Sequence, residues 1–184
     1  SAPCSHGGRS GRDRLTLLAA LERQILAGRP WVGGEDICQA FDNVSPALLC
    51  RLIPEIAKEK QLRRLIWTMI KKPTGAVGID QGHACSMDFL DLLLHHHLDG
   101  PLMAAYPGTP LVWRYVDDLT TASRSANQSR ALRQQIVAFL MGCGLALKES
   151  KHRLVNSNRQ GAKIEALGLH LKKSSATQMD HRIP

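Results

Sequence analysis

Two adjacent aspartates, Asp117 and Asp118, stand in the stretch RYVDDLTTAS between two runs of strand-forming residues. Consecutive side chains of a regular strand point to opposite faces, so both carboxylates can reach one ion only from the tip of a hairpin. The flanking runs LVWRYV and LTTAS are suited to be the arms of that hairpin. Taken alone, the pair is typical of a solvated turn, because aspartate is common in turns.

A third carboxylate changes this interpretation. Asp36 ends another apolar run, WVGGEDI, which is expected to be a neighbouring strand. An oxygen-only site of this kind suits Mg²⁺, which binds through few carboxylates and completes its shell with water and phosphate oxygens. Without a cation, three clustered carboxylates would repel one another and raise their pKa values. The trio therefore predicts a metal, and two such ions would clamp the attacking and leaving oxygens of phosphoryl transfer.

The composition is that of a basic globular chain. It has 184 residues and a formal net charge of +8, with the basic excess concentrated toward the C-terminus. This length suffices for a core, and the charge favours a polyanionic partner, either nucleic acid or an anionic membrane surface. The five cysteines form no C-x-x-C pair, which indicates reduced, mostly core thiols rather than a disulfide framework or a zinc site. No apolar run approaches the roughly 18 residues of a membrane span, so a soluble, cytoplasmic protein without membrane contact is expected.

The elements that must position these residues follow from periodicity and from the Gly and Pro positions. After a loose start, helices are expected over residues 15–27, 46–72 (kinked or divided at Pro54), 87–99 and 126–142. Strands are expected over residues 31–37, 111–116, 119–123, 152–156 and 163–171. This order suits an α+β fold, an antiparallel sheet with helices packed on one face. Residues 1–30 are expected to form an N-terminal extension with one helix, and residues 174–184 a polar C-terminal tail.

The chemistry-bearing residues fall into an ordered series: EDICQAFDNVSPALL, QG, YVDD, GLALKESK and ALGLHL. The series resembles the ordered motifs of reverse transcriptases, and it is most similar to the bacterial forms found in group II introns and retrons. The resemblance runs from about Trp31 to Lys172. It implies an RNA-directed DNA polymerase palm over residues 31–173, with partial fingers at about 46–80 and the thumb missing. A fragment, a short divergent enzyme or one piece of a larger assembly is therefore expected.

The resemblance implies catalytic roles for four residues. Asp36, Asp117 and Asp118 would be the metal carboxylates, with Asp118 the more peripheral because neighbouring strand residues face apart. Lys151 would protonate the leaving pyrophosphate or stabilise its charge, and Lys148 is close enough in sequence to compete for that role. The implied cofactor is a pair of Mg²⁺ ions, with Mn²⁺ as the alternative metal.

Other residues are implied to contact substrates. Phe41 matches the bulky residue that excludes a ribose 2′-hydroxyl, and the alternative interpretation is a core aromatic before a helix. Gln81 and Gly82 match the loop that contacts the incoming nucleotide and the template. The residues expected at the primer end are Tyr115, Leu167 and Gly168. The implied partners are an RNA template, a DNA or RNA primer and deoxynucleoside triphosphates, with a structured RNA or an accessory protein as further candidates.

Some features depart from the family or favour other readings. Asp80 and Met87 stand where the family usually has prolines. The missing fingers and thumb keep open a non-catalytic, nucleic-acid-binding module. The letters GGED, ending at Asp36, invite comparison with diguanylate cyclases, but that family explains neither YVDD nor QG. The tract of His95 to His97 could suggest a metal site, yet adjacent helical residues point about 100° apart, so two of the three are expected to be exposed.

Overall fold

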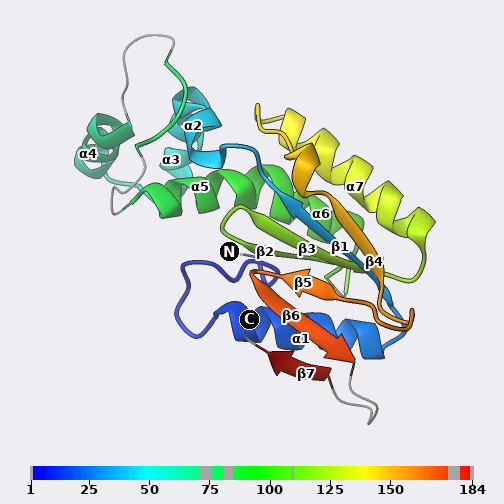
Figure 1. Ribbon diagram of the computed structural model, residues 1–184. Coiled ribbons are helices and arrows are strands. Elements are labelled where there is room, and N and C mark those ends of the chain that lie inside the picture. The colour runs from blue at the N-terminus through cyan, green and yellow to red at the C-terminus, as the bar shows by residue number, and fades with distance from the viewer. Residues whose placement is uncertain (1, 71–75, 81–84, 109, 174–178, 183–184) are drawn as a thin grey trace.

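A four-stranded antiparallel sheet forms the centre of the protein (Figure 1), with the strand order β2–β3–β1–β4. The computed structural model describes residues 2–70, 76–80, 85–108, 110–173 and 179–182, with side chains through Leu171. The strands are β1 (Trp31–Asp36), β2 (Val112–Tyr115), β3 (Asp118–Ser123) and β4 (Arg153–Asn156). The expected mixture of helices with an antiparallel sheet is confirmed.

One face of this sheet is covered by a helical layer (Figure 1). The layer consists of α5 (Ser86–Leu94), the π-helix η1 (His95–Asp99), α6 (Gly100–Ala105) and α7 (Ala126–Met141). In α7, Leu132, Ile136 and Leu140 recur every four residues and are fully buried against the same core as Leu119 of β3. Burying side chains of this size contributes about 1.5–3 kcal/mol each. The helical layer is therefore attached to the sheet by its apolar stripe.

The opposite face is also covered, so the expectation of helices on one face only is wrong. Helix α1 (Arg14–Leu26) lies there, and its Leu17 and Leu21 share a second core with Val32, Trp113 and Ala122 of the sheet. Side chains alternate along a strand, and in these strands the apolar residues occupy both faces. A sheet that is apolar on both faces must be covered twice.

A second, three-stranded sheet lies beside α1 (Figure 1). It consists of β5 (Ile164–Ala166), β6 (Leu169–Lys173) and β7 (Met179–Arg182), all antiparallel. The single strand expected over 163–171 is therefore a hairpin. Its turn is Leu167–Gly168, with φ angles of 56° and 73°. Part of the expected C-terminal tail is the strand β7.

The N-terminal segment, expected to be loose, is packed along the free edge of β2. Ser5 forms a parallel bridge with Arg114, and the backbone N–H of His6 donates to the Arg114 carbonyl over 2.8 Å. The Arg114 N–H in turn donates to the carbonyl of Cys4 over 2.9 Å. An exposed strand edge invites pairing with another chain, and this segment covers most of it. Residues 2–6 are thus part of the sheet layer.

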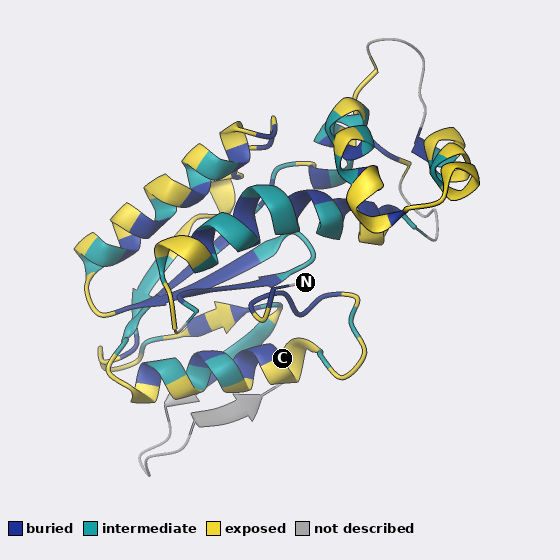
Figure 2. Cartoon of the chain, turned by 180° about the vertical axis from the view of Figure 1, so that it is seen from behind, coloured by how far each residue is buried: buried dark blue, intermediate teal, exposed yellow. Residues whose placement is uncertain are grey.

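Three further helices stand at one end of the sheet (Figure 1): α2 (Ala40–Asn43), α3 (Pro46–Ile56) and α4 (Lys60–Ile70). Helix α3 begins at the Ser45 cap and ends two residues after Pro54, so the long helical stretch is divided, as expected. Figure 2 shows that α4, at this end of the molecule, is mostly exposed. Helices α3 and α4 fall within residues 46–80, where partial fingers are expected. Within the described residues no helix is both long and apolar enough to cross a membrane.

Candidate active site

The predicted aspartate hairpin is confirmed. The pair of residues nearest the turn between β2 and β3 is Tyr115 with Asp118. Val116 and Asp117 between them form the two-residue turn. Val116 has φ 59°, an unusual conformation for a β-branched side chain. Such a conformation costs about 1–3 kcal/mol and persists only where the surroundings hold it.

The side chain of Arg114 holds this turn. It is 1% exposed, and its Nη1 donates to the carbonyl oxygen of Val116 over 3.0 Å. Its other nitrogens donate to Asp99 from η1 and to Asp91 from α5, at 2.5–3.2 Å. Burial alone would lower the pKa of Arg114, but the hydrogen bonds and charge of Asp99 raise it. The sequence analysis missed this residue, although an arginine inside the apolar run LVWRYV was a signal.

Asp36 and Asp118 face each other across neighbouring strands. They are directly paired in the β1–β3 register, and both belong to the strand positions that face α1 and the second sheet. Asp117 sits beside them in the turn, and its carbonyl accepts a hydrogen bond from Ile37 N over 3.1 Å. The structure thus pairs Asp36 with Asp118, whereas the sequence placed Asp118 at the periphery. Which of the three binds metal most firmly stays a prediction.

A cleft of about 250 Å³ joins four of the sequence motifs. Asp36 of β1, Asp118 of β3 and Lys151 of η2 (Glu149–Lys151) line this cleft. The turn residues Leu167 and Gly168 line it from the second sheet. These residues are far apart in the sequence. The antiparallel register of β1 and β3, together with the β5–β6 hairpin, brings them to one place.

The cleft is electrostatically unfavourable for ionised carboxylates. Burial raises the pKa of Asp118, and the charges of Asp117 and Asp36 raise it further, while Lys151 and Arg14 act in the opposite direction. Burial also raises the pKa of Asp117, and Asp36 adds to that shift. The three carboxylates therefore repel one another through space, as expected from the sequence.

The donors present suit a hard cation, but they do not converge fully. Within the described part of the chain, no three His, Cys, Asp or Glu side chains come together as a group that could hold a metal ion. Mg²⁺ commonly uses one or two protein carboxylates and takes its remaining ligands from water and substrate phosphates. The paired Asp36 and Asp118 fit that pattern, since both are oxygen donors in one cleft.

The other predicted site residues are placed as follows. Tyr115 lies opposite Asp118 in the hairpin, with the guanidinium of Arg14 5.5 Å from the centre of its ring. Phe41 lies on α2, partly buried against the main core, and it does not line the cleft. Lys148 is also outside the cleft lining, which favours Lys151 over Lys148. The nucleotide-loop residues Gln81 and Gly82 lie outside the described residues.

Two alternative readings of the sequence lose support. The letters GGED lie within the strand β1 rather than in a turn, which does not fit a cyclase-type signature. His95 to His97 are all half-buried in the π-helix η1, so the expectation that two are exposed is wrong. His96 contacts Glu55 over 3.2 Å.

Comparison with known proteins finds likeness in structure alone. No protein-family model and no curated protein matches the sequence. The telomerase of Candida albicans, in complex with a TWJ fragment of telomeric RNA, matches with a TM-score of 0.71 and 14% identity. That match covers 96% of this chain and 34% of the telomerase chain. Apo telomerase from Candida tropicalis, truncated from the C-terminal domain, matches with a TM-score of 0.71 and 15% identity, over 98% of this chain and 41% of its own.

These likenesses define the class of fold. The chain has the fold of part of these telomerase chains, and it spans less than half of their length. At such low identity the likeness shows the fold alone. It does not support the bacterial group II intron or retron subtype that the motifs indicated.

Proposed function

We propose that the chain is the palm, with partial fingers, of an RNA-directed DNA polymerase that adds deoxynucleotides to a primer 3′-hydroxyl. The observation that carries the proposal is the single cleft in which Asp36, Asp118, Lys151 and the Leu167–Gly168 turn meet. The fold likeness to telomerases supports it independently. An RNA template is the proposed partner, and a structured RNA is a further one, because the Candida albicans telomerase is seen with an RNA fragment.

Each part of the cleft has a role in this reaction. Asp36, Asp118 and Asp117 would hold two Mg²⁺ ions, or Mn²⁺ in their place, which supply charge neutralisation to the phosphoryl groups. Lys151 is proposed to stabilise or protonate the leaving pyrophosphate. Tyr115 and the Leu167–Gly168 turn are proposed to position the primer end.

Of the residues proposed to contact the nucleotide, Phe41 does not line the cleft, and Gln81 and Gly82 lie outside the described residues. Phe41, which precedes α3 on the short helix α2, is proposed as the residue that rejects a ribose 2′-hydroxyl. Gln81 and Gly82 are proposed to contact the incoming nucleotide and the template, from the resemblance alone.

Primer extension on an RNA template tests the proposal. The purified chain should extend an annealed primer with deoxynucleotides and Mg²⁺, and Asp117→Ala should lower the rate by at least about a thousandfold, since charge stabilisation is the largest part of such catalysis. Asp88→Ala, at an acid outside the cleft lining, is the control and should retain activity. Equal inactivity of wild type and Asp117→Ala, with primer and template still bound, would remove the catalytic claim.

One observation favours a second function. The carboxylates do not converge as a metal-binding group within the described residues, and that is the state expected of a reverse-transcriptase-like module that binds nucleic acid without extending it. Binding of an RNA–DNA duplex by the inactive chain, with affinity that falls steeply as salt rises, would support this module.

A further inference from the structure

Glu35 is a buried acid on the side of β1 opposite the cleft. Its side chain is 3% exposed. It directly precedes Asp36 in β1 and lies on the same face of the strand as Gly33. Asp36 faces the cleft, so Glu35 faces α7 on the other side of the sheet. There it lines a second cavity of about 220 Å³, together with Arg130 and Arg133 of α7 and with His152.

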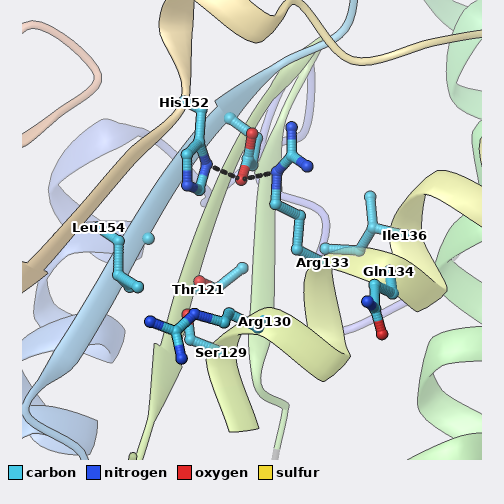
Figure 3. Close-up of a pocket in the computed structure, with 10 residues that line it drawn as sticks. Thr121, Ser129, Arg130, Arg133, Gln134, Ile136, His152 and Leu154 are labelled. Carbon is cyan, nitrogen blue, oxygen red and sulfur yellow. Dashed lines mark hydrogen bonds and ion pairs between the residues drawn. The ribbon is translucent and has the colours of Figure 1, made fainter. Parts of the chain in front are cut away.

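One carboxylate oxygen of Glu35 is contacted by two side chains, one from α7 and one from the residue that follows η2. Figure 3 shows His152 and Arg133 reaching this oxygen from different directions, His152 Nδ1 over 2.6 Å and Arg133 Nε over 3.0 Å. A carboxylate only accepts, so Nδ1 of His152 carries the proton in this bond. The other carboxylate oxygen is buried and has no hydrogen-bond partner among the described residues.

The same contacts fix the short helix that carries Lys151. Arg133 also donates from Nη2 to Glu149, the first residue of η2, over 2.7 Å. At the edge of β1, the backbone N–H of Lys148 donates to the Asp36 carbonyl over 2.8 Å. Residues 148–152 are thus attached to the backbone of β1 at one end and to Glu35 and Arg133 by side chains, and Lys151 lies between these attachments.

Stability alone does not account for this cluster. Burying a carboxylate costs several kcal/mol, and a buried ion pair is often no more stable than apolar side chains of similar volume. Glu35 also leaves one buried oxygen without a partner, which adds to the cost. What the cluster provides, and an apolar residue would not, is a directional link between β1, α7 and η2.

We propose that Glu35, Arg133 and His152 are positioning residues that hold Lys151 over Asp36 and Asp118. Their side chains meet on the α7 side of β1, and they act through the segment 148–152. The catalytic part of this inference rests on the proposed polymerase function, whereas the attachment of the segment does not.

Amide hydrogen exchange tests the attachment without any need for activity. The variants are His152→Ala, at a side chain that is 39% exposed, and Arg133→Ala, both on full-length chain. Exchange at residues 148–152 should become at least about threefold faster in each, because an ion pair of this kind protects locally. Arg130→Ala is the matched control: Arg130 lines the same cavity but is hydrogen-bonded to Asn127, within its own helix, so exchange should stay unchanged.

Kinetics test what the attachment does. His152→Ala should lower kcat by about tenfold with little change in KM for deoxynucleotide, since small displacements of a catalytic group are costly. His152→Asn retains an N–H donor near the position of Nδ1 and should restore most of kcat. In a Lys151→Ala background, His152→Ala should cost less than about twofold, because both changes remove one interaction.

Three results would overturn the inference or separate it from the function. Unchanged exchange at 148–152 in both variants would show that the cluster does not hold the segment. A full kcat loss that persists in the Lys151→Ala background would show that it does not act through Lys151. If wild type extended no primer, the polymerase proposal would fail, and faster exchange in both variants would still support the attachment.

Discussion

At the scale of single residues, the aspartates of the cleft are held in a state that opposes their ionisation. The folded pKa values of Asp117 and Asp118 are raised, first by burial and then by neighbouring carboxylates. A carboxyl with a raised folded pKa holds more protons in the folded state than in the unfolded state. Stability therefore falls as pH rises from the ordinary value of 3.8 through the folded value, and the full cost is present above it.

Removing one charge should therefore stabilise the protein at neutral pH. We expect Asp118→Asn to raise the melting temperature at pH 7 by about 2–4 °C, a range typical of a 1 kcal/mol change in a chain of this size. The difference should shrink as pH falls below about 4, where the wild-type carboxyl is protonated. Thermal unfolding between pH 3.5 and pH 8 measures both.

Magnesium provides the control for this effect. If the carboxylates bind Mg²⁺, the cation should raise the melting temperature of wild type and not that of Asp118→Asn, since binding stabilises only a chain that keeps its ligands. A melting temperature for Asp118→Asn at or below wild type across the pH range, without Mg²⁺, would contradict the repulsion.

At the scale of elements, the hairpin depends on the helical layer behind it. Arg114 links the Val116 carbonyl to Asp91 of α5 and Asp99 of η1, so the turn that carries Asp117 is fixed by elements that lie outside the cleft. We expect Arg114→Met to lower the free energy of unfolding by about 3–5 kcal/mol, because it leaves the buried carboxylate of Asp99 without its arginine partner. Denaturant unfolding measures the loss.

A nearby arginine offers the matched control. Arg9 contacts the same Asp91 over 3.3 Å, but both side chains are partly exposed. Arg9→Ala should cost less than about 1 kcal/mol, as is usual for exposed ion pairs. Equal losses for Arg9→Ala and Arg114→Met would show that burial of the Arg114 network is not what stabilises the hairpin.

The β5–β6 turn gives a second prediction at this scale. Gly168 has φ 73°, and nothing lies within 4 Å of the place where a Cβ would stand, so the backbone conformation alone calls for glycine. We expect Gly168→Ala to lower the free energy of unfolding by about 1–2 kcal/mol, the cost of a left-handed conformation. Its KM for primer should also rise, because the turn lines the cleft.

Gly34→Ala is the comparison in the same cleft. Gly34 lies in β1 without a positive φ, and an added Cβ would meet only Arg153 at 4.0 Å, an ordinary contact. The substitution should leave stability unchanged or raise it by about 0.5 kcal/mol. A stability loss at Gly34 as large as at Gly168 would show that the positive φ is not the cause.

At the scale of the whole molecule, the N-terminal segment supports the site from the edge of the sheet. An added Cβ at Gly7 would lie 2.5 Å from the backbone nitrogen of Val116, so this segment packs closely against the aspartate turn. We expect Gly7→Ala to lower the melting temperature by several degrees and to increase self-association, because the β2 edge is then less well covered. Thermal unfolding and light scattering measure the two effects.

A substitution to alanine at an exposed residue of the same segment serves as the control. Ser10 is exposed, and Ser10→Ala should change neither measurement. A Gly7→Ala variant that melts like wild type would show that residues 2–7 do not support the hairpin.

Much of the fold could be read from the sequence where local physics decides it. The helix starts at residues 46 and 126 were predicted, and in the structure the side chains of Ser45 and Ser125 cap these two helices. The aspartate hairpin followed from two strand-forming runs around turn residues. The element pattern predicted one strand over residues 163–171, whereas the resemblance singled out Leu167 and Gly168, which form the turn of a hairpin. The turn places Leu167 in a left-handed conformation, and leucine gives no turn signal.

The elements on the second face were misplaced for a different reason. Periodicity showed that α1 has an apolar stripe, but it does not say which face of which sheet that stripe covers. The packing of residues 2–6 along β2 was also missed, since backbone pairing at a strand edge needs no apolar pattern.

The sequence by itself determined which residue types could do chemistry: three carboxylates, a lysine and a glycine turn, in an order that resembles reverse transcriptases. Only the tertiary structure decided which of them meet. The antiparallel register of β1 and β3 places Asp36 opposite Asp118 and leaves Asp117 in the turn. That register is set by side-chain packing on both faces of the sheet, which involves residues far apart in the chain, and a local pattern cannot express it.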